Sequence, residues 1–424
     1  MSAAAVAEQA ARNSYGRLLA YLAWRWRDIA AAEDALADAF AAALESWPQT
    51  GVPDSPEAWL MTAAKRNLLQ MERHAKVAAD PAITILLGEE ESSAPDVPAI
   101  PDTRLKLLFV CAHPAIDPAI RTALMLQTVL GLDAKRIASA FLVSPTTMAQ
   151  RLVRAKTKIA QAGIRFEEPE ARDLPERIHA VLEAIYAAYG LGWDGLAPDA
   201  LGSDAATDLV GEAMYLADLT ASLLPESAEA AGLLALLLLC ESRRAARYSA
   251  SGQFVPLHAQ DSSLWDKEAI SQADHLLGMA AAKHQPGPFQ LEAAIQAAHC
   301  HRVFTGNVPW QDIARLYDQL VQLAPTTGAR VSRAVAMAES GQVLDGLAAL
   351  AELDASAAAS YQPYWVALAH LQSLAGQTTN ADASYQRALG LTSQPAVRVF
   401  LQDKLKLLAL PAAGPDQPGP LPRP

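Results

Sequence analysis

Residues 117–159 read DPAIRTALMLQTVLGLDAKRIASAFLVSPTTMAQRLVRAKTKI and contain three helical segments in close succession. Asp117 followed by Pro118 is typical of a helix start, because aspartate caps the first turn and proline fits its first position. Apolar residues then recur at three- and four-residue intervals up to Gly131, which predicts the end of this helix. A short second helix is expected after Asp133 and a third after Ser144. This order and spacing are those of a helix-turn-helix.

The third of these helices has two different faces. Its apolar stripe consists of Met148, Leu152, Ala155 and Ile159. The neighbouring stripe is polar and basic. In a helix-turn-helix the first residues of this helix would reach base edges, and the later cations would lie near phosphates. The candidate DNA contacts are therefore Ser144, Thr146, Thr147, Gln150, Arg151, Arg154 and Lys158.

A solvated surface helix is the alternative interpretation, and the charge distribution argues against it. The formal net charge is −12, but residues 1–165 carry 18 basic and 17 acidic side chains, and residues 166–424 carry 16 and 29. Seven basic residues and no acidic one lie between Lys135 and Arg165. Because salt screens charges beyond about 8 to 10 Å, this basic run can attract a polyanion even within an acidic chain.

The composition predicts an all-α protein of several domains. The chain has 424 residues, 51% of them hydrophobic and only 6% aromatic, and is rich in alanine. Its three cysteines form no CxxC pair, which fits a reducing compartment, and we expect a cytoplasmic protein. The N-terminus does not resemble a signal peptide, and the apolar run at 232–240 is too short to span a membrane.

Near the N-terminus, an acidic helix precedes a basic one. Residues 33–47 read EDALADAFAAALESW, with Leu36, Phe40, Leu44 and Trp47 on one helical face. After a turn-rich loop, AWLMTAAKRNLLQMERH at 58–74 has an aromatic residue near its start and cations further on. Such a helix could stack Trp59 on an exposed base while its cations hold phosphates. The alternative is a core tryptophan beside a solvated charged face.

Weak repeats occur in the last third of the chain. Gly341 and Gly376 stand 35 residues apart in equivalent turns, and the sequence around the second matches a tetratricopeptide pattern. Another helix pair is expected at 290–304 and 310–323. Stacked pairs leave a concave face that commonly binds protein, although packing without a partner is also possible. The composition gives the divisions 10–75, an acidic and proline-containing linker at 76–102, 103–166, 175–285, 286–410 and a disordered proline-rich tail at 411–424.

No enzymatic motif is present, so we predict no catalytic activity, cofactor or metal. The sequence has no phosphate-binding glycine loop and no nucleophile motif. His299-Cys300-His301 could suggest a metal site, but adjacent helical residues point in different directions and cannot all bind one ion.

Several of these segments resemble a known family. AEDALADAFAAALESW at 32–47 and SPEAWLMTAAKRNLLQMERH at 55–74 resemble region 2 of bacterial sigma factors of the extracytoplasmic-function type. Residues 105–166 resemble region 4 of the subgroup with a long helical extension related to tetratricopeptide repeats. LPERIHAVLEAIYAAYG at 174–190 and IARLYDQL at 313–320 resemble that extension.

The resemblance implies a region 2 helical domain, a region 4 helix-turn-helix domain and an extension with tetratricopeptide-like repeats. It implies core RNA polymerase and promoter DNA as partners, with a further regulatory protein as a possible partner of the extension. The helix from Pro145 to Lys158 would read the upstream promoter element, and the linker would thread toward the nucleic-acid channels of the polymerase. The downstream element would be held by Trp59, Lys65, Arg66, Asn67 and Arg73. Polymerase would be bound by Asp34, Asp38 and Phe40.

Two other classes of protein remain open. A helix-turn-helix regulator with a repeat-type sensor domain would bind DNA without polymerase, and a pure scaffold would bind neither. The N-terminal block favours a sigma factor, because a regulator has no need for an acidic helix, a loop and an aromatic, basic helix in that order.

Overall fold

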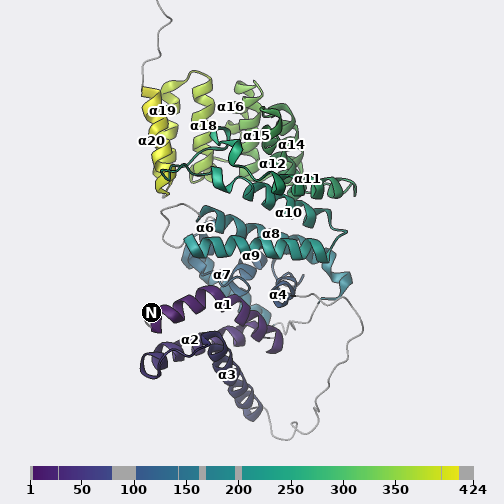
Figure 1. Ribbon diagram of the computed structural model, residues 1–424, viewed down its shortest axis with the longest axis vertical. Helices are drawn as coiled ribbons and strands as arrows, with labels where there is room; N and C mark the ends of the chain where they lie inside the picture. The colour runs from purple at the N-terminus through teal and green to yellow at the C-terminus, as the bar shows by residue number, and fades with distance from the viewer. Residues whose placement is uncertain are drawn as a thin grey trace, which may run out of the picture. The chain divides into compact units, whose positions relative to one another are not determined.

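The computed structural model describes residues 3–26, 28–78, 102–141, 143–161, 169–195, 203–392 and 394–409. Within these ranges the chain forms α-helices α1 to α20 and short 3-10 turns, with no β-strand, which confirms the all-α prediction. The expected tail lies outside the described residues, as does the expected linker apart from its first three residues and its last one. Chain contacts define two compact units, Met1–Leu234 and Ala235–Pro424. Figure 1 colours the helices by their order in the chain, from purple α1 to yellow α20.

The chain begins with three helices that pack on one another: α1 (Ala3–Trp26), α2 (Ile29–Thr50) and α3 (Pro56–Ala78). The carboxylate of Asp28 accepts a hydrogen bond from the Ala31 amide and begins α2. Leu36 and Trp47 are buried, but Leu44 is 50% exposed. The buried face of α2 is completed mainly by alanines: Ala32, Ala35, Ala39 and Ala43. Small side chains at these positions let the neighbouring helices approach closely.

Four more helices follow in the first unit, and the last three of them begin at the residues that the sequence indicated. They are α4 (Thr103–Cys111), α5 (Pro118–Thr128), α6 (Ala134–Ala140) and α7 (Pro145–Gln161). The side chains of Asp117, Asp133 and Ser144 each accept a backbone amide hydrogen bond, at 2.8 to 3.1 Å, from the first turn of the helix that follows. Met148, Leu152 and Ile159 are buried, so the apolar stripe of α7 packs as expected.

Helices α8 (Leu174–Asp194) and α9 (Ser203–Leu223) form an antiparallel hairpin in the first unit. A Cβ at Gly192 would lie 3.0 Å from the Ala206 carbonyl oxygen, so glycine allows the two helices to approach closely. Helix α8 also packs on α4 and α5. The first unit thus includes α8 and α9 along with α1 to α7. Helix α10 (Ala228–Glu241) crosses the boundary between the units.

The second unit is mainly a stack of helix pairs. After α11 (Lys267–Ala281) the helices are α12 (Pro288–Cys300), α13 (Arg302–Thr305), α14 (Trp310–Leu323), α15 (Thr327–Glu339), α16 (Val343–Ala351), α17 (Ala355–Ala359), α18 (Gln362–Leu374), α19 (Thr378–Leu391) and α20 (Pro395–Ala409). Gly341 and Gly376 have φ of 100° and 73° and turn the chain between the members of successive pairs, which confirms the predicted equivalent turns. Gly306, a further 35 residues upstream, has φ of 74° and makes the same turn.

None of the helices in the described ranges is both long enough and apolar enough to cross a lipid bilayer.

Candidate nucleic-acid interface

Helix α7 presents its predicted DNA contacts to solvent. Ser144, Thr146, Thr147, Gln150, Arg151, Arg154 and Lys158 are all exposed. The Ser144 hydroxyl accepts from the Thr147 amide and lies 2.8 Å from the Thr147 hydroxyl, so this pair also defines the start of the helix. Because the opposite face is fixed by buried Met148 and Leu152, the polar and basic face has a defined direction.

One cation of α7 is directed into the protein instead. The Nζ atom of Lys156 donates to the Oε2 atom of Glu33 on α2, at 2.6 Å. The two side chains are only 17% and 20% exposed. This pair joins α7 to the acidic helix, and sequence reasoning missed it because the partners are 123 residues apart.

On α2, the predicted polymerase contacts have different surroundings. Asp34 and Asp38 are exposed, whereas Phe40 is half-buried and stacks on Tyr15 of α1, with ring centroids 6.1 Å apart. Burial, together with the nearby charges of Glu33 and Asp34, raises the pKa of the Tyr15 hydroxyl. The two aspartates thus present negative charge to solvent, while Phe40 contributes to the packing of α1 on α2.

On α3, the predicted downstream contacts also fall into two groups. Arg66 and Arg73 are exposed. The other three, Trp59, Lys65 and Asn67, make contacts within the helical bundle. Trp59 packs edge-on against buried Trp47 at 5.5 Å, the Lys65 Nζ lies 4.7 Å from the Tyr21 ring centroid, and the Asn67 amide donates to the Ala35 carbonyl.

Helix α1 binds the N-terminal helices to the helices of the expected region 4. A Cβ at Gly16 would lie 2.1 Å from the carbonyl oxygen of Val129, so the two backbones touch. Gly131 has φ of 66°, and a Cβ there would lie 3.1 Å from the Tyr15 ring. Tight backbone contacts of this kind define one specific docked arrangement within the first unit.

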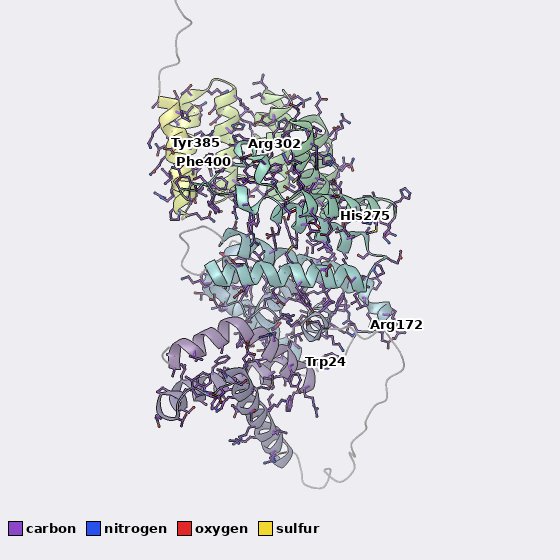
Figure 2. All side chains as sticks on the ribbon, in the orientation of Figure 1. Trp24, Arg172, His275, Arg302, Tyr385 and Phe400 are labelled. Atoms are coloured by element: carbon purple, nitrogen blue, oxygen red, sulfur yellow. The ribbon has the colours of Figure 1, made fainter. Side chains whose placement is uncertain are left out.

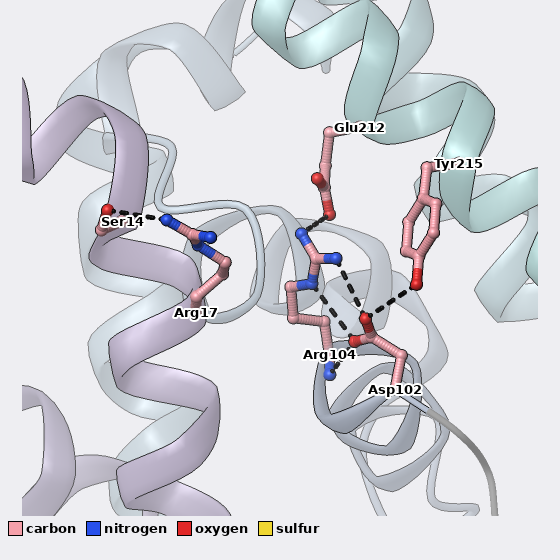
Figure 3. Close-up of polar contacts among 6 residues, drawn as sticks. All are labelled: Ser14, Arg17, Asp102, Arg104, Glu212 and Tyr215. Atoms are coloured by element: carbon pink, nitrogen blue, oxygen red, sulfur yellow. Dashed lines mark hydrogen bonds and ion pairs between the residues drawn. The ribbon is translucent and has the colours of Figure 1, made fainter.

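A polar network joins the start of α4 to α9 (Figure 3). The Asp102 carboxylate accepts from the backbone amide of Arg104 at 2.7 Å and from its guanidinium at 3.0 and 3.2 Å. Arg104 also donates to Glu212, and the Tyr215 hydroxyl donates to Asp102 at 3.3 Å. Both carboxylates are partly buried, which opposes ionisation.

The two carboxylates of this network differ in pKa. Burial alone would raise the pKa of Asp102, but the hydrogen bonds and charge of Arg104 hold it below the usual value. For Glu212 burial prevails and raises the pKa in spite of Arg104. The Arg104 guanidinium lies between the two carboxylates, and its ion pair with Asp102 is bidentate.

Helix α8 also forms a hydrogen bond with α4. The guanidinium of Arg177, whose residue is only 8% exposed, donates to the carbonyl oxygen of Phe109 at 3.3 Å and lies 3.7 Å from Asp173. Phe109 itself is fully buried. Helices of the expected extension therefore bury part of the expected region 4.

The histidines that could have suggested a metal site have separate surroundings. His299 is buried against Trp310, with ring centroids 5.2 Å apart, whereas the His301 ring is paired with Asp274 at 3.2 Å. Among the residues described, no group of three or more His, Cys, Asp or Glu side chains is placed to hold a metal ion.

One match to a known protein family covers the N-terminal helices. Residues 12–76, which cover most of α1, all of α2 and nearly all of α3, match sigma-70 region 2. This match supports a sigma factor, a transcription factor with a role in promoter recognition. Residues 177–281, from α8 to the end of α11, match a family of unknown function, DUF6596.

A full-length comparison defines the family. The uncharacterized protein R00370 of Rhizobium meliloti (strain 1021) is 34% identical over 404 residues, which is 94% of this chain and 93% of the relative. The chain belongs to the same family as R00370.

Proposed function

We propose that this protein is an alternative sigma factor of the extracytoplasmic-function type, which binds core RNA polymerase inside the cell and directs transcription initiation. The observation that carries the proposal is the sigma-70 region 2 match over α1 to α3, in a chain whose α7 also presents an exposed polar and basic face.

Each promoter element has a matching surface. Helix α7 enters the major groove of the upstream element, with Gln150 near base edges and the cations of the exposed face near phosphates. Arg66 and Arg73 of α3 hold the phosphates of the downstream element. Trp59, Lys65 and Asn67 act there only if their contacts in the bundle rearrange, since all three are engaged with α1 or α2.

Helix α2 is the polymerase contact. Its exposed Asp34 and Asp38 suit a basic surface, and Phe40 adds an apolar edge. Lys156 on α7 is paired with Glu33, which directly precedes Asp34 on α2. The docked first unit therefore positions the DNA-reading helix beside the polymerase contact. The 23 residues between Ala78 and Asp102 can span at most about 80 Å, which allows the two parts to separate on a promoter.

The C-terminal extension regulates the transcription initiation. Its helices α8 and α9 hold α4 through Arg177 and through the pair between Arg104 and Glu212. The helix pairs of the second unit resemble tetratricopeptide repeats and recruit a partner protein. No cofactor or metal takes part.

The decisive experiment is transcription in vitro with purified core polymerase. A sigma factor co-elutes with core polymerase and supports specific initiation from a cognate promoter. A helix-turn-helix regulator with a tetratricopeptide-type sensor domain would bind DNA without polymerase, and a scaffold would bind neither. Failure to bind core polymerase would refute the proposal.

A further inference from the structure

The second unit contains an irregular segment that is not part of its helix stack. Between α10 and α11, residues 242–266 form only 3-10 turns and a short hairpin. Tyr248 and Phe254 pair as an antiparallel bridge, and the Ser249 amide donates to the Gln253 carbonyl at 2.9 Å. Gly252 has φ of 77° and makes the turn. The Phe254 ring packs edge-on against the Tyr248 ring of the same hairpin, with centroids 6.3 Å apart.

Phe254 reaches the last helix of the chain. Its ring packs edge-on against Phe400 of α20, with centroids 5.7 Å apart. Phe400 also packs on the core of the last helix pair, and Lys404 Nζ lies 5.5 Å from its ring centroid. The contact joins residues 146 positions apart.

The residues that follow the hairpin are held through hydrogen bonds to their backbone carbonyl groups. The two terminal nitrogens of Arg302, on α13, donate to the carbonyl oxygens of His258 and Gln260, each at 2.8 Å. The same guanidinium lies 4.9 Å from the ring centroid of buried Trp265. One arginine thus binds two backbone carbonyl oxygens of this irregular segment. Because every residue has a backbone carbonyl, this contact does not depend on the side chains of the segment.

The segment follows one side of the stack from α13 to α20. His258 lies within electrostatic range of Glu339 on α15, His370 on α18 and Lys404 on α20. His370 and Glu339 are hydrogen-bonded at 2.7 Å, so they link the first helices of two successive pairs. Arg302 and Phe400, labelled in Figure 2, mark the two ends of this path.

The contacts are those of a bound peptide and not of a core. Pro256 has φ of −65° and ψ of 153°, and Gln260 has φ of −65° and ψ of 139°, which are polyproline II values. Residues 254–257 are only half-buried, and His258 is exposed. Polyproline II residues that flank a turn held by an arginine, with an aromatic ring as anchor, resemble a bound proline-containing peptide.

We propose that residues 249–260 are an intramolecular ligand of this face of the helix stack. The same face binds a partner protein through an extended segment with an aromatic residue two positions before a proline, as in Phe254-Val255-Pro256, and the partner segment displaces the internal one. The inference does not depend on a sigma-factor role.

The test uses full-length protein and a fluorescein-labelled peptide with the sequence of residues 250–260, ASGQFVPLHAQ. A tethered segment competes at an effective concentration of the order of millimolar, so wild-type protein should bind the peptide weakly. Phe254→Ala removes the internal anchor and should raise the affinity for the peptide about tenfold or more. A peptide carrying the same F254A substitution should not bind.

Leu344→Ala is the matched control, because Leu344 is 73% exposed on α16, outside this path, and the variant should behave as wild type. Equal peptide affinity of wild type and Phe254→Ala, or no binding by either, would overturn the proposal. Should Phe254→Ala fail to fold, hydrogen exchange of wild-type protein decides. Excess peptide should speed amide exchange within residues 249–260 about threefold or more, and unchanged exchange refutes displacement.

Discussion

The ammonium group of Lys156 lies 2.6 Å from the carboxylate of Glu33, and this pair connects the helix predicted to read DNA to the acidic helix predicted to bind polymerase. Both side chains are more than three-quarters buried. The contact accompanies the backbone packing of Gly16 on Val129, so it belongs to a docked arrangement of the first unit.

Glu33→Gln should make α7 more available to DNA. The substitution removes the charge partner of the mostly buried Lys156, so it weakens a contact that holds α7 against α2. We expect the affinity of the free protein for promoter DNA to rise about fivefold or more, measured by fluorescence anisotropy. Asp38→Asn is the control, because it makes the same change in net charge at an exposed position of α2. Equal gains in both variants would show that the pair does not restrain α7.

Arg151→Ala and Arg154→Ala should weaken DNA binding with little dependence on sequence. Each removed phosphate contact should lower the slope of log affinity against log salt by about 0.9. Gln150→Ala should instead change sequence preference. Gel shifts with polymerase over a salt series measure both effects, with Arg315→Ala in the second unit as a control. If none of the three α7 variants differs from wild type, α7 does not dock as proposed.

Local signals in the sequence predicted much of the fold. Asp117, Asp133 and Ser144 each act through the backbone within three residues, so their capping roles could be read from the chain. Gly341 and Gly376 required left-handed backbone for the same local reason.

Contacts between distant segments could not be predicted in this way. Nothing near Lys156 distinguishes it from Arg154 or Lys158, and its different role depends on Glu33. On α2 two of the large residues that suggested the packing face, Leu36 and Trp47, are buried, but Leu44 is exposed. Alanines complete the face, because helices approach most closely where side chains are small. For Trp59 the sequence leaves base stacking and a core position open, and the packing on Trp47 that favours the core position is visible only in the folded bundle.

Gly16→Ala should disrupt the docking of α1. Its added methyl group would lie 2.1 Å from a backbone oxygen, so the helix or the Val129 turn must shift. Overpacking of this kind costs about 1 to 3 kcal/mol, and we expect a lower melting temperature. Gly211→Ala on α9 is the matched control, because the added methyl group there meets no atom within 4 Å. That variant should be unchanged or more stable by up to about 1 kcal/mol. Equal melting temperatures for the two variants would contradict the close contact.

The second unit should lose stability in acid because of His299. Burial, with Arg243 and Arg302 nearby, lowers the pKa of His299 to about 4 from its ordinary value of 6.5. Above pH 6.5 the ring is neutral in both folded and unfolded chains, so stability does not depend on it. Below pH 6.5 His299 binds a proton in the unfolded chain but stays neutral in the folded one until the pH approaches 4. The free energy of unfolding therefore falls by about 3 kcal/mol between pH 6.5 and pH 4.

His299→Phe should remove this part of the pH dependence, because a phenyl ring can fill the space beside Trp310 without binding a proton. Denaturant unfolding of wild type and variant at several pH values measures the difference. His275→Gln, at an exposed histidine of α11, should keep the wild-type profile. A profile for His299→Phe as steep as that of wild type would show that acid acts on the second unit through other groups.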